Sequence, residues 1–126
     1  MPDQATISSL NSFFAGYPKI DGVYLFGSVA SSKTHKESDI DLGIIYNDSF
    51  LTDQKLELYA DLIRAGIDNA DLVFFNDANL VLQFEIIHHN RLIYRKDEFN
   101  HGELFSNTIR KYFDIKHILR YQHKKN

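Results

Sequence analysis

Hydrophobic residues along this chain recur with a helical period in some segments and with a strand period in others. Apolar residues three and four positions apart over residues 5–17 predict a short amphipathic helix. An apolar run over residues 20–26 then predicts a strand, with Val23 and Leu25 on one of its faces. A polar stretch leads to a second predicted strand over residues 39–46, so the chain begins as helix, strand and strand.

The second half of the chain continues to alternate between the two periods. The predicted elements are a helix over residues 51–65, a strand over 70–75, a helix over 79–89, a short strand over 92–94 and a last helix over about 103–122. In the first of these helices we expect four residues to face the core: Leu51, Leu58, Leu62 and Ile63. The helix over 79–89 has an apolar face made of Leu80, Val81, Phe84 and Ile87. The last helix carries a periodic row: Phe105, Ile109, Tyr112, Ile115 and Leu119.

This order of elements predicts an α/β (α+β) fold, a small mixed β-sheet of about four strands with helices packed mainly on one face. At 126 residues the chain is expected to form a single domain over residues 1–126. Its core would span about residues 20–95, with the C-terminal helix over about 103–122 packed beside it.

Composition narrows the class of protein. With 44% hydrophobic and 25% charged residues the chain is typical of a soluble globular protein, and the absence of cysteine excludes disulfides and thiolate metal sites. We find neither an apolar run long enough to span a membrane nor a signal-peptide pattern, so a cytoplasmic location is expected. A net charge of −3 argues against a protein that coats nucleic acid.

Two short polar motifs stand out. Gly27 and Ser28 follow the first strand directly, where a tight turn without a side chain lets phosphate oxygens approach backbone N–H groups, and Ser28 adds a hydroxyl donor. Ten residues later come Asp39 and Asp41, which share one face if their segment is a strand. Two converging carboxylates are costly unless a cation lies between them, and hard oxygen ligands suit Mg²⁺.

A third acid, Asp71, begins a later apolar strand. Each motif alone is weak, because a Gly-Ser turn and a Ser-Asp strand start are common. The full combination of strand, Gly27-Ser28, ten-residue gap, Asp39-x-Asp41, helix and Asp71 is far more specific, and it favours a site for a metal-bound nucleotide.

These residues resemble the minimal nucleotidyltransferases of the polymerase-β-like nucleotidyltransferase superfamily, which include the antitoxins of HEPN–MNT toxin–antitoxin pairs. The resemblance covers about residues 20–95. It implies that Gly27 and Ser28 contact the triphosphate of ATP, and that Asp39 and Asp41 bind two Mg²⁺ ions. By the same resemblance Asp71 completes the metal site and helps to deprotonate the acceptor hydroxyl.

The sequence departs from the family in the loop between the motifs. The family commonly has Ala-Arg-Gly after Gly-Ser-x, whereas this chain has Ala30-Ser31-Ser32. The lost arginine removes a cation near the phosphates, which Lys33 or Lys36 could replace only as a point charge. Lys33 and Ser38 are taken as further nucleotide-binding candidates.

The resemblance implies a Mg²⁺-dependent enzyme that transfers AMP from ATP to a tyrosine of a cognate HEPN ribonuclease toxin, with which it forms a hetero-oligomer. This would make the chain an antitoxin of a type VII-like pair, with no direct nucleic-acid or membrane partner. Two alternatives stay open. One is a degenerate module that neutralises its partner by binding alone, and the other is a small-molecule nucleotidyltransferase related to aminoglycoside-modifying enzymes.

The last helix has a basic end that allows two interpretations. Its Lys and Arg residues are Arg110, Lys111, Lys116, Arg120, Lys124 and Lys125. A solvated charged face with favourable placement near a helix C-terminus is the commoner case. The functional interpretation is a contact surface for a partner protein.

Overall fold

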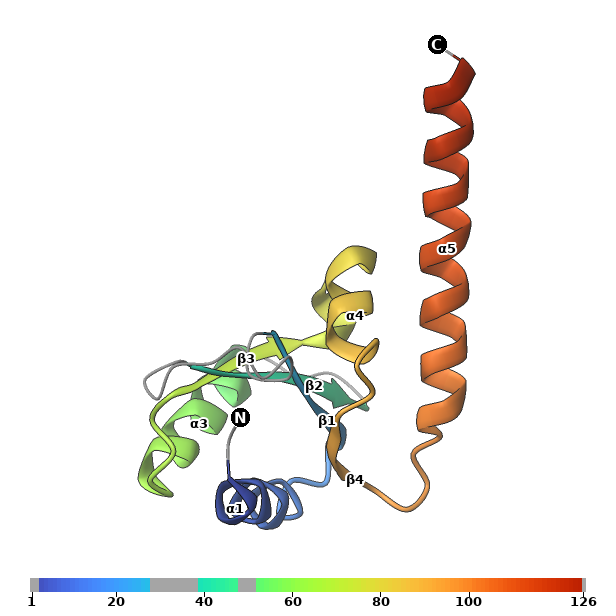
Figure 1. The fold of residues 1–126 in the computed structure, drawn as a ribbon. Coiled ribbons are helices and arrows are strands. Elements are labelled where there is room, and N and C mark those ends of the chain that lie inside the picture. The colour runs from blue at the N-terminus through green and yellow to red at the C-terminus, as the bar shows by residue number, and fades with distance from the viewer. Residues whose placement is uncertain (1–2, 28–38, 48–51, 126) are drawn as a thin grey trace.

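The computed structural model of the protein describes residues 3–27, 39–47 and 52–125 (Figure 1). Its elements are α1 (Gln4–Phe14), β1 (Ile20–Phe26), β2 (Ile40–Tyr46), α3 (Thr52–Arg64), β3 (Ala70–Phe74), the 3₁₀ helix η1 (Phe75–Asp77), α4 (Leu80–Ile87), β4 (Leu92–Arg95) and α5 (His101–Lys125). The strands form one sheet in the order β3-β2-β1-β4. β1 is antiparallel to β2 and β4, whereas β2 and β3 are parallel, so the predicted mixed four-stranded sheet is confirmed.

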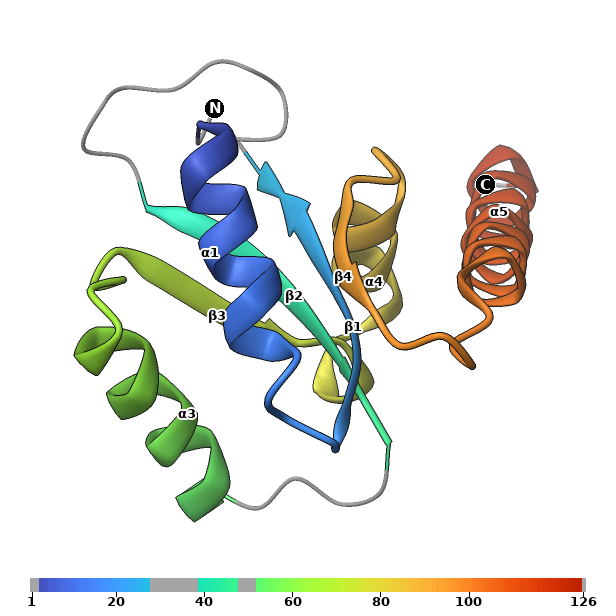
Figure 2. The same ribbon diagram turned by 90° about the horizontal axis from the view of Figure 1, so that it is seen from below.

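The two faces of the sheet support two separate hydrophobic cores. The first core holds Val23 and Leu25 of β1, and the second holds Tyr24 and Phe26, as the alternation along the strand predicts. Helices α1 and α3 cover the face of the first core (Figure 2). On the opposite face α4 covers the second core, and α5 packs against α4 (Figure 1). The structure thus adds a smaller helical layer on the second face.

Helix α1 begins where an acidic side chain caps it and ends at a turn before β1. The Thr6 backbone N–H donates to Asp3 Oδ1 at 2.8 Å, which satisfies one of the free amides of the first turn. From this helix Leu10 and Phe14 are fully buried in the first core. The Asn11 side chain also donates to the Ile93 backbone oxygen at 2.8 Å, which ties α1 to β4.

Helix α3 corrects one expectation from the sequence. Leu58 and Leu62 are buried as predicted, but Ile63 is 59% exposed, so its predicted core position is wrong. One residue advances a helix by about 100°, and this rotation takes Ile63 off the buried face. Leu51 lies outside the described residues.

Close packing between α4 and the sheet depends on a glycine. A Cβ atom at Gly43 of β2 would overlap Ile86 Cγ2, so α4 approaches the strand through a position without a side chain. Ile86 and Ile87 are both fully buried, whereas Val81, assigned to the apolar face from the sequence, is 61% exposed. Gly43 therefore sets how closely the second helical layer sits on the sheet.

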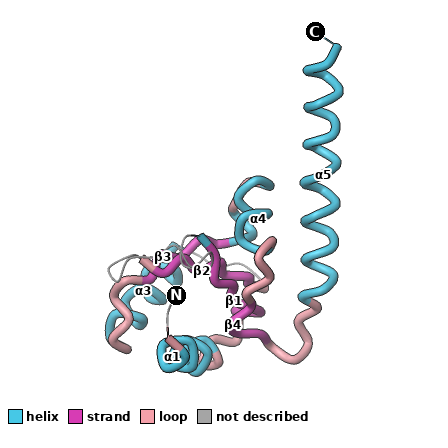
Figure 3. The backbone as a smooth tube through the Cα atoms, in the orientation of Figure 1, coloured by secondary structure: helices cyan, strands magenta, loops and turns pink. Residues whose placement is uncertain are grey.

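Helix α5 is longer than the predicted 103–122 and extends well beyond the sheet (Figure 3). Its first turns contact α4, where the rings of Phe84 and Tyr112 stack with centroids 3.9 Å apart. Within the described residues, none of the helices is both long and apolar enough to cross a membrane. The assignment of residues 1–126 to a single domain stays a prediction.

The adjacent residues Leu62 and Ile63 provide a test of the first core. We expect Leu62→Ala to lower the free energy of unfolding by about 2–5 kcal/mol, because it leaves a cavity in a packed interior. Ile63→Ala should cost less than about 1 kcal/mol, since the side chain is already hydrated. Urea denaturation followed by circular dichroism measures both, and equal losses would contradict this packing.

Candidate functional site

The candidate site lies at the end of the sheet where β1 ends and β2 and β3 begin (Figure 1). β1 runs antiparallel to β2, so its last residue, Phe26, pairs with Asp41 near the start of β2. β3 runs parallel to β2 and therefore begins at the same end. This topology gathers three segments that are far apart in the sequence.

Gly27 follows β1 and lies against Asp41. Its φ angle is 75°, a backbone conformation that residues with a Cβ atom rarely adopt. A Cβ atom at this position would overlap Asp41 Oδ2 and lie 3.1 Å from Asp41 Cγ. Backbone freedom and close approach both require glycine here, and the structure brings the two sequence motifs together at this point.

Asp41 and Asp71 lie side by side on neighbouring strands. The parallel register of β2 and β3 pairs Asp41 directly with Asp71. Leu42 and Leu72, the residues that follow them, both point into the first core, so both carboxylates lie on the opposite face of the sheet. Asp71 is exposed to solvent and Asp41 is partly buried.

The third acid, Asp39, comes just before β2 and is exposed. Burial raises the pKa of Asp41 above its ordinary value, and the negative charges of Asp71 and then Asp39 raise it further. All three carboxylates are thus close enough to interact electrostatically. A cation near Asp41 would relieve both the repulsion and the cost of burial.

Carboxylate oxygens are hard ligands of the kind that Mg²⁺ prefers, so the chemistry of these three residues fits that ion. Among the described residues, however, no three acidic or histidine side chains already stand in a cluster that could hold a metal. The assignment of Asp39, Asp41 and Asp71 as metal ligands therefore stays a prediction.

Part of the predicted nucleotide-binding set cannot be placed. Ser28, Lys33 and Ser38 lie outside the described residues, as do Ser31 and Ser32, which replace the family's Arg-Gly. Gly27 is the one member of that set that the described residues include. The predicted phosphate contacts of Ser28, Lys33 and Ser38 are therefore supported by the sequence alone.

One residue that positions the site was missed by the sequence analysis. The Leu72 backbone N–H donates to the Tyr59 hydroxyl of α3 at 2.9 Å, and the same hydroxyl lies 3.3 Å from the Leu72 carbonyl oxygen. Tyr59 thus holds the outer strand next to Asp71. No local pattern distinguishes Tyr59 from other helix residues, because its partner is a backbone group 13 positions away.

Comparison with protein families gives one domain match. The family described as "Polymerase beta, Nucleotidyltransferase" matches residues 8–99 of this chain. The "Protein adenylyltransferase MntA" of Shewanella oneidensis is 29% identical over 106 residues, which are 84% of this chain and 69% of that protein. Gly27 and all three acids lie inside the family match.

Solved structures with the same fold include two toxin–antitoxin complexes. A crystal structure of a toxin–antitoxin with AMP-PNP matches with a TM-score of 0.76 and 22% identity over 94% of this chain and 96% of that one. A structure of a tri-AMPylated Shewanella oneidensis HEPN toxin in complex with MNT antitoxin matches with a TM-score of 0.72 and 20% identity over 97% and 96%. Both matches extend over most of the length of this chain.

The burial of Asp41 and the repulsion by its acidic neighbours predict a pH-dependent effect on stability. Its folded pKa lies above the ordinary 3.8, so this carboxyl stabilises the fold below about pH 3.8 and that contribution is lost as the pH rises through the folded pKa. Without divalent cations, Asp41→Asn should therefore melt at a higher temperature than the wild type at pH 7, with little difference near pH 3.

Thermal unfolding in EDTA across this pH range measures the effect. Asp68→Asn, which removes an exposed carboxyl outside the strands, serves as the control and should leave the melting temperature nearly unchanged at both pH values. A wild type that is as stable as Asp41→Asn at pH 7 would contradict the cost assigned to the ionised Asp41 carboxylate.

Proposed function

Because the chain belongs to the polymerase beta nucleotidyltransferase family, we propose that it transfers AMP from ATP to a hydroxyl group of a protein partner. The observation that carries this proposal is the pairing of Asp41 with Asp71 beside Gly27. Two acids on adjacent strands next to a side-chain-free turn provide a place for a metal-bound triphosphate.

The partner we propose is a cognate HEPN toxin, with a tyrosine as acceptor. The relative MntA is named a protein adenylyltransferase, and a structure with the same fold holds an AMPylated HEPN toxin beside its MNT antitoxin. ATP as the nucleotide is supported by the AMP-PNP in another such complex. In this role the chain is an antitoxin that inactivates the toxin by modifying it.

In the proposed reaction the acceptor oxygen forms a bond to the α-phosphorus of ATP while the bond from that phosphorus to the pyrophosphate oxygen breaks. The acceptor proton passes to a carboxylate. Our candidate is Asp71, because it is more exposed than its neighbour Asp41 and therefore more accessible to an incoming hydroxyl. Two Mg²⁺ ions, held by Asp39, Asp41 and Asp71, would supply the positive charge that the phosphates need.

Gly27 has a separate part in this proposal. A phosphate oxygen can reach the backbone N–H at this turn because no Cβ atom shields it. The close approach to Asp41 would put the bound phosphates next to the carboxylates. Ser28, Lys33 and Ser38 remain our candidates for further contacts with the nucleotide.

Removal of the carboxylates should abolish transfer. We expect Asp39→Asn, Asp41→Asn and Asp71→Asn each to lower the transfer rate by about a hundredfold or more, since each loses charge that stabilises the transition state. The assay mixes the purified chain with labelled ATP, Mg²⁺ and the HEPN toxin proposed as its partner. Asp68→Asn is the matched control and should transfer normally.

The same assay separates the alternatives. Tight binding of the partner without transfer, unaffected by the three substitutions, would replace the proposal with a module that neutralises by binding alone. Label that appears on an aminoglycoside but not on the protein would favour a small-molecule enzyme. Normal transfer by Asp71→Asn alone would remove that residue from the site.

Two glycines with similar backbones allow a test of the turn. Gly27 and Gly66 both have positive φ, but a Cβ atom at Gly66 would meet nothing within 4 Å. We expect Gly27→Ala and Gly66→Ala to lose about 1–2 kcal/mol of stability each from backbone strain. Only Gly27→Ala should also reduce AMP transfer, by about tenfold or more, because it displaces Asp41. Equal transfer by both variants would show that the turn plays no part.

A further inference from the structure

The outer half of α5 has an apolar surface that the described part of the chain leaves uncovered. We call residues 113–120 the arm. Its apolar side chains are between 48% and 60% exposed, and they are Phe113, Ile115, Ile118 and Leu119. The Phe113 ring lies edge-on to Phe84 of α4, with centroids 6.3 Å apart, and the outer part of α5 beyond it stands clear of the rest of the fold in two perpendicular views (Figures 1 and 2). Such a surface on a protein indicates a contact that the isolated chain does not make.

The uncovered surface continues a row that is already in use for packing. Phe105, Thr108 and Tyr112 follow one another at three and four positions and lie against α4, where Thr108 is buried. The next positions of the same row are Ile115 and Leu119. The apolar row that packs against α4 along the inner half of α5 therefore continues, as the same kind of surface, along the outer half.

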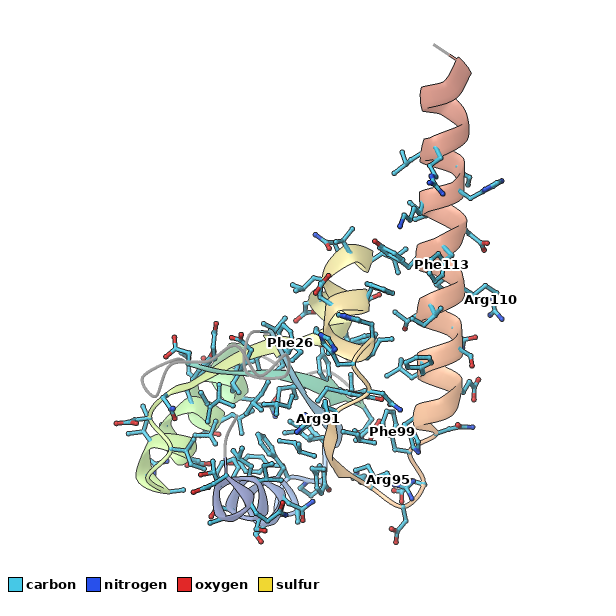
Figure 4. All side chains as sticks on the ribbon, in the orientation of Figure 1. Phe26, Arg91, Arg95, Phe99, Arg110 and Phe113 are labelled. Carbon is cyan, nitrogen blue, oxygen red and sulfur yellow. The ribbon has the colours of Figure 1, made fainter. Side chains whose placement is uncertain are left out.

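The arm also carries positive charge beside this row. Phe113, Lys116, His117 and Arg120 line an open groove of about 280 Å³ on α5. The Lys116 ammonium lies 6.0 Å from the centre of the Phe113 ring. Figure 4 shows Phe113 on the side of α5 that faces α4 and Arg110 on the outer side. The apolar row and the basic groove therefore adjoin on the same part of the helix.

The distribution of charge along the chain points to the chemistry of the occupant. Residues 101–126 hold six Lys and Arg against two acidic residues, whereas residues 1–100 hold eight against fifteen. Two arms laid together would bring like charges into contact, which disfavours a pair of identical arms. An acidic amphipathic helix, with an apolar row flanked by carboxylates, complements both features of the arm.

The arm projects on the same side of the sheet as the candidate site. α4 and Asp41 lie on the same face of the sheet, and α5 rises on that side (Figure 1). A protein that presents a hydroxyl to the carboxylates from this side therefore has the arm beside it.

We propose that the arm docks an acidic amphipathic helix of the acceptor protein, a step that rests on the proposed AMP transfer for the identity of that protein. Ile115 and Leu119 cover the apolar row of the incoming helix, and Lys116 and Arg120 pair with its carboxylates. Docking on the arm holds the acceptor over the carboxylate face, so the arm determines which protein is modified without touching the reacting atoms.

Matched pairs of variants on the full-length chain test this docking. Lys116→Glu reverses a charge in the groove, whereas Lys111→Glu reverses one about 140° around the helix. Leu119→Ser removes an apolar contact from the row, whereas Ile118→Ser removes one outside it. All four residues are exposed, so the fold should tolerate each change.

Binding is measured by calorimetry with the purified HEPN toxin proposed as the acceptor. We expect Lys116→Glu and Leu119→Ser to weaken binding by about tenfold or more, with little change for their controls. Transfer at limiting partner concentration should fall in parallel. The thermal stabilisation by ATP and Mg²⁺ alone should stay at the wild-type level, because the arm is remote from Asp41.

The outcomes separate docking from chemistry. If the wild type binds but transfers nothing, and Lys116→Glu still weakens binding more than Lys111→Glu, the docking holds and the proposed transfer fails. If the wild type transfers and all four variants behave alike, the docking fails. A wild-type dimer in sedimentation that Leu119→Ser dissociates would make a second copy of this chain the occupant and overturn the proposal.

Discussion

The parallel pairing of β2 with β3 is the interaction on which the candidate site depends, because it sets Asp41 directly beside Asp71. β3 lies at the edge of the sheet, so it has a neighbouring strand on one side only. The Tyr59 hydroxyl and the bond from the Ile40 N–H to the Asn69 carbonyl oxygen, at 2.8 Å, hold the start of this strand in register. A slip by one residue would turn Asp71 into the first core.

The alignment of the acids opposes folding, and the cores on both faces offset it. Burial, and then repulsion by Asp71 and Asp39, raise the pKa of Asp41, which means that its ionised form is disfavoured in the folded chain. The larger first core, closed by α1 and α3, and the close fit of Ile86 on Gly43 supply the compensating burial. Strain gathered at a few residues on a well-packed scaffold is common at functional sites.

Chemistry and recognition occupy different parts of this molecule. Asp41 and Asp71 lie in strands of the sheet, whereas the arm is the outer part of α5, whose inner part packs against α4. This division fits the proposed transfer to a protein acceptor, because an extended surface away from the carboxylates gives a large substrate room to bind. On the proposed function, residues of the arm can therefore vary without disturbing Asp39, Asp41 and Asp71.

The sequence by itself determined the order and type of the elements, the mixed sheet and the two faces of β1. These features follow from local periodicity, since Val23 and Leu25 must share a face whenever residues 20–26 are extended. The spacing of Gly27, Asp39 and Asp41 also identified the candidate site, and the strand position of Asp71 added the third acid.

Only the tertiary structure decided which residues meet across elements. It exposed Ile63, buried Ile86 against Gly43, and recruited Tyr59 to the strand that carries Asp71. Likewise, a periodic row of apolar residues predicts that a helix is amphipathic, but it does not predict how much of that row a neighbouring helix covers. Contact with α4 covers the row as far as Tyr112 and leaves Ile115 and Leu119 open. Such outcomes depend on distances between segments remote in sequence, which local patterns do not encode.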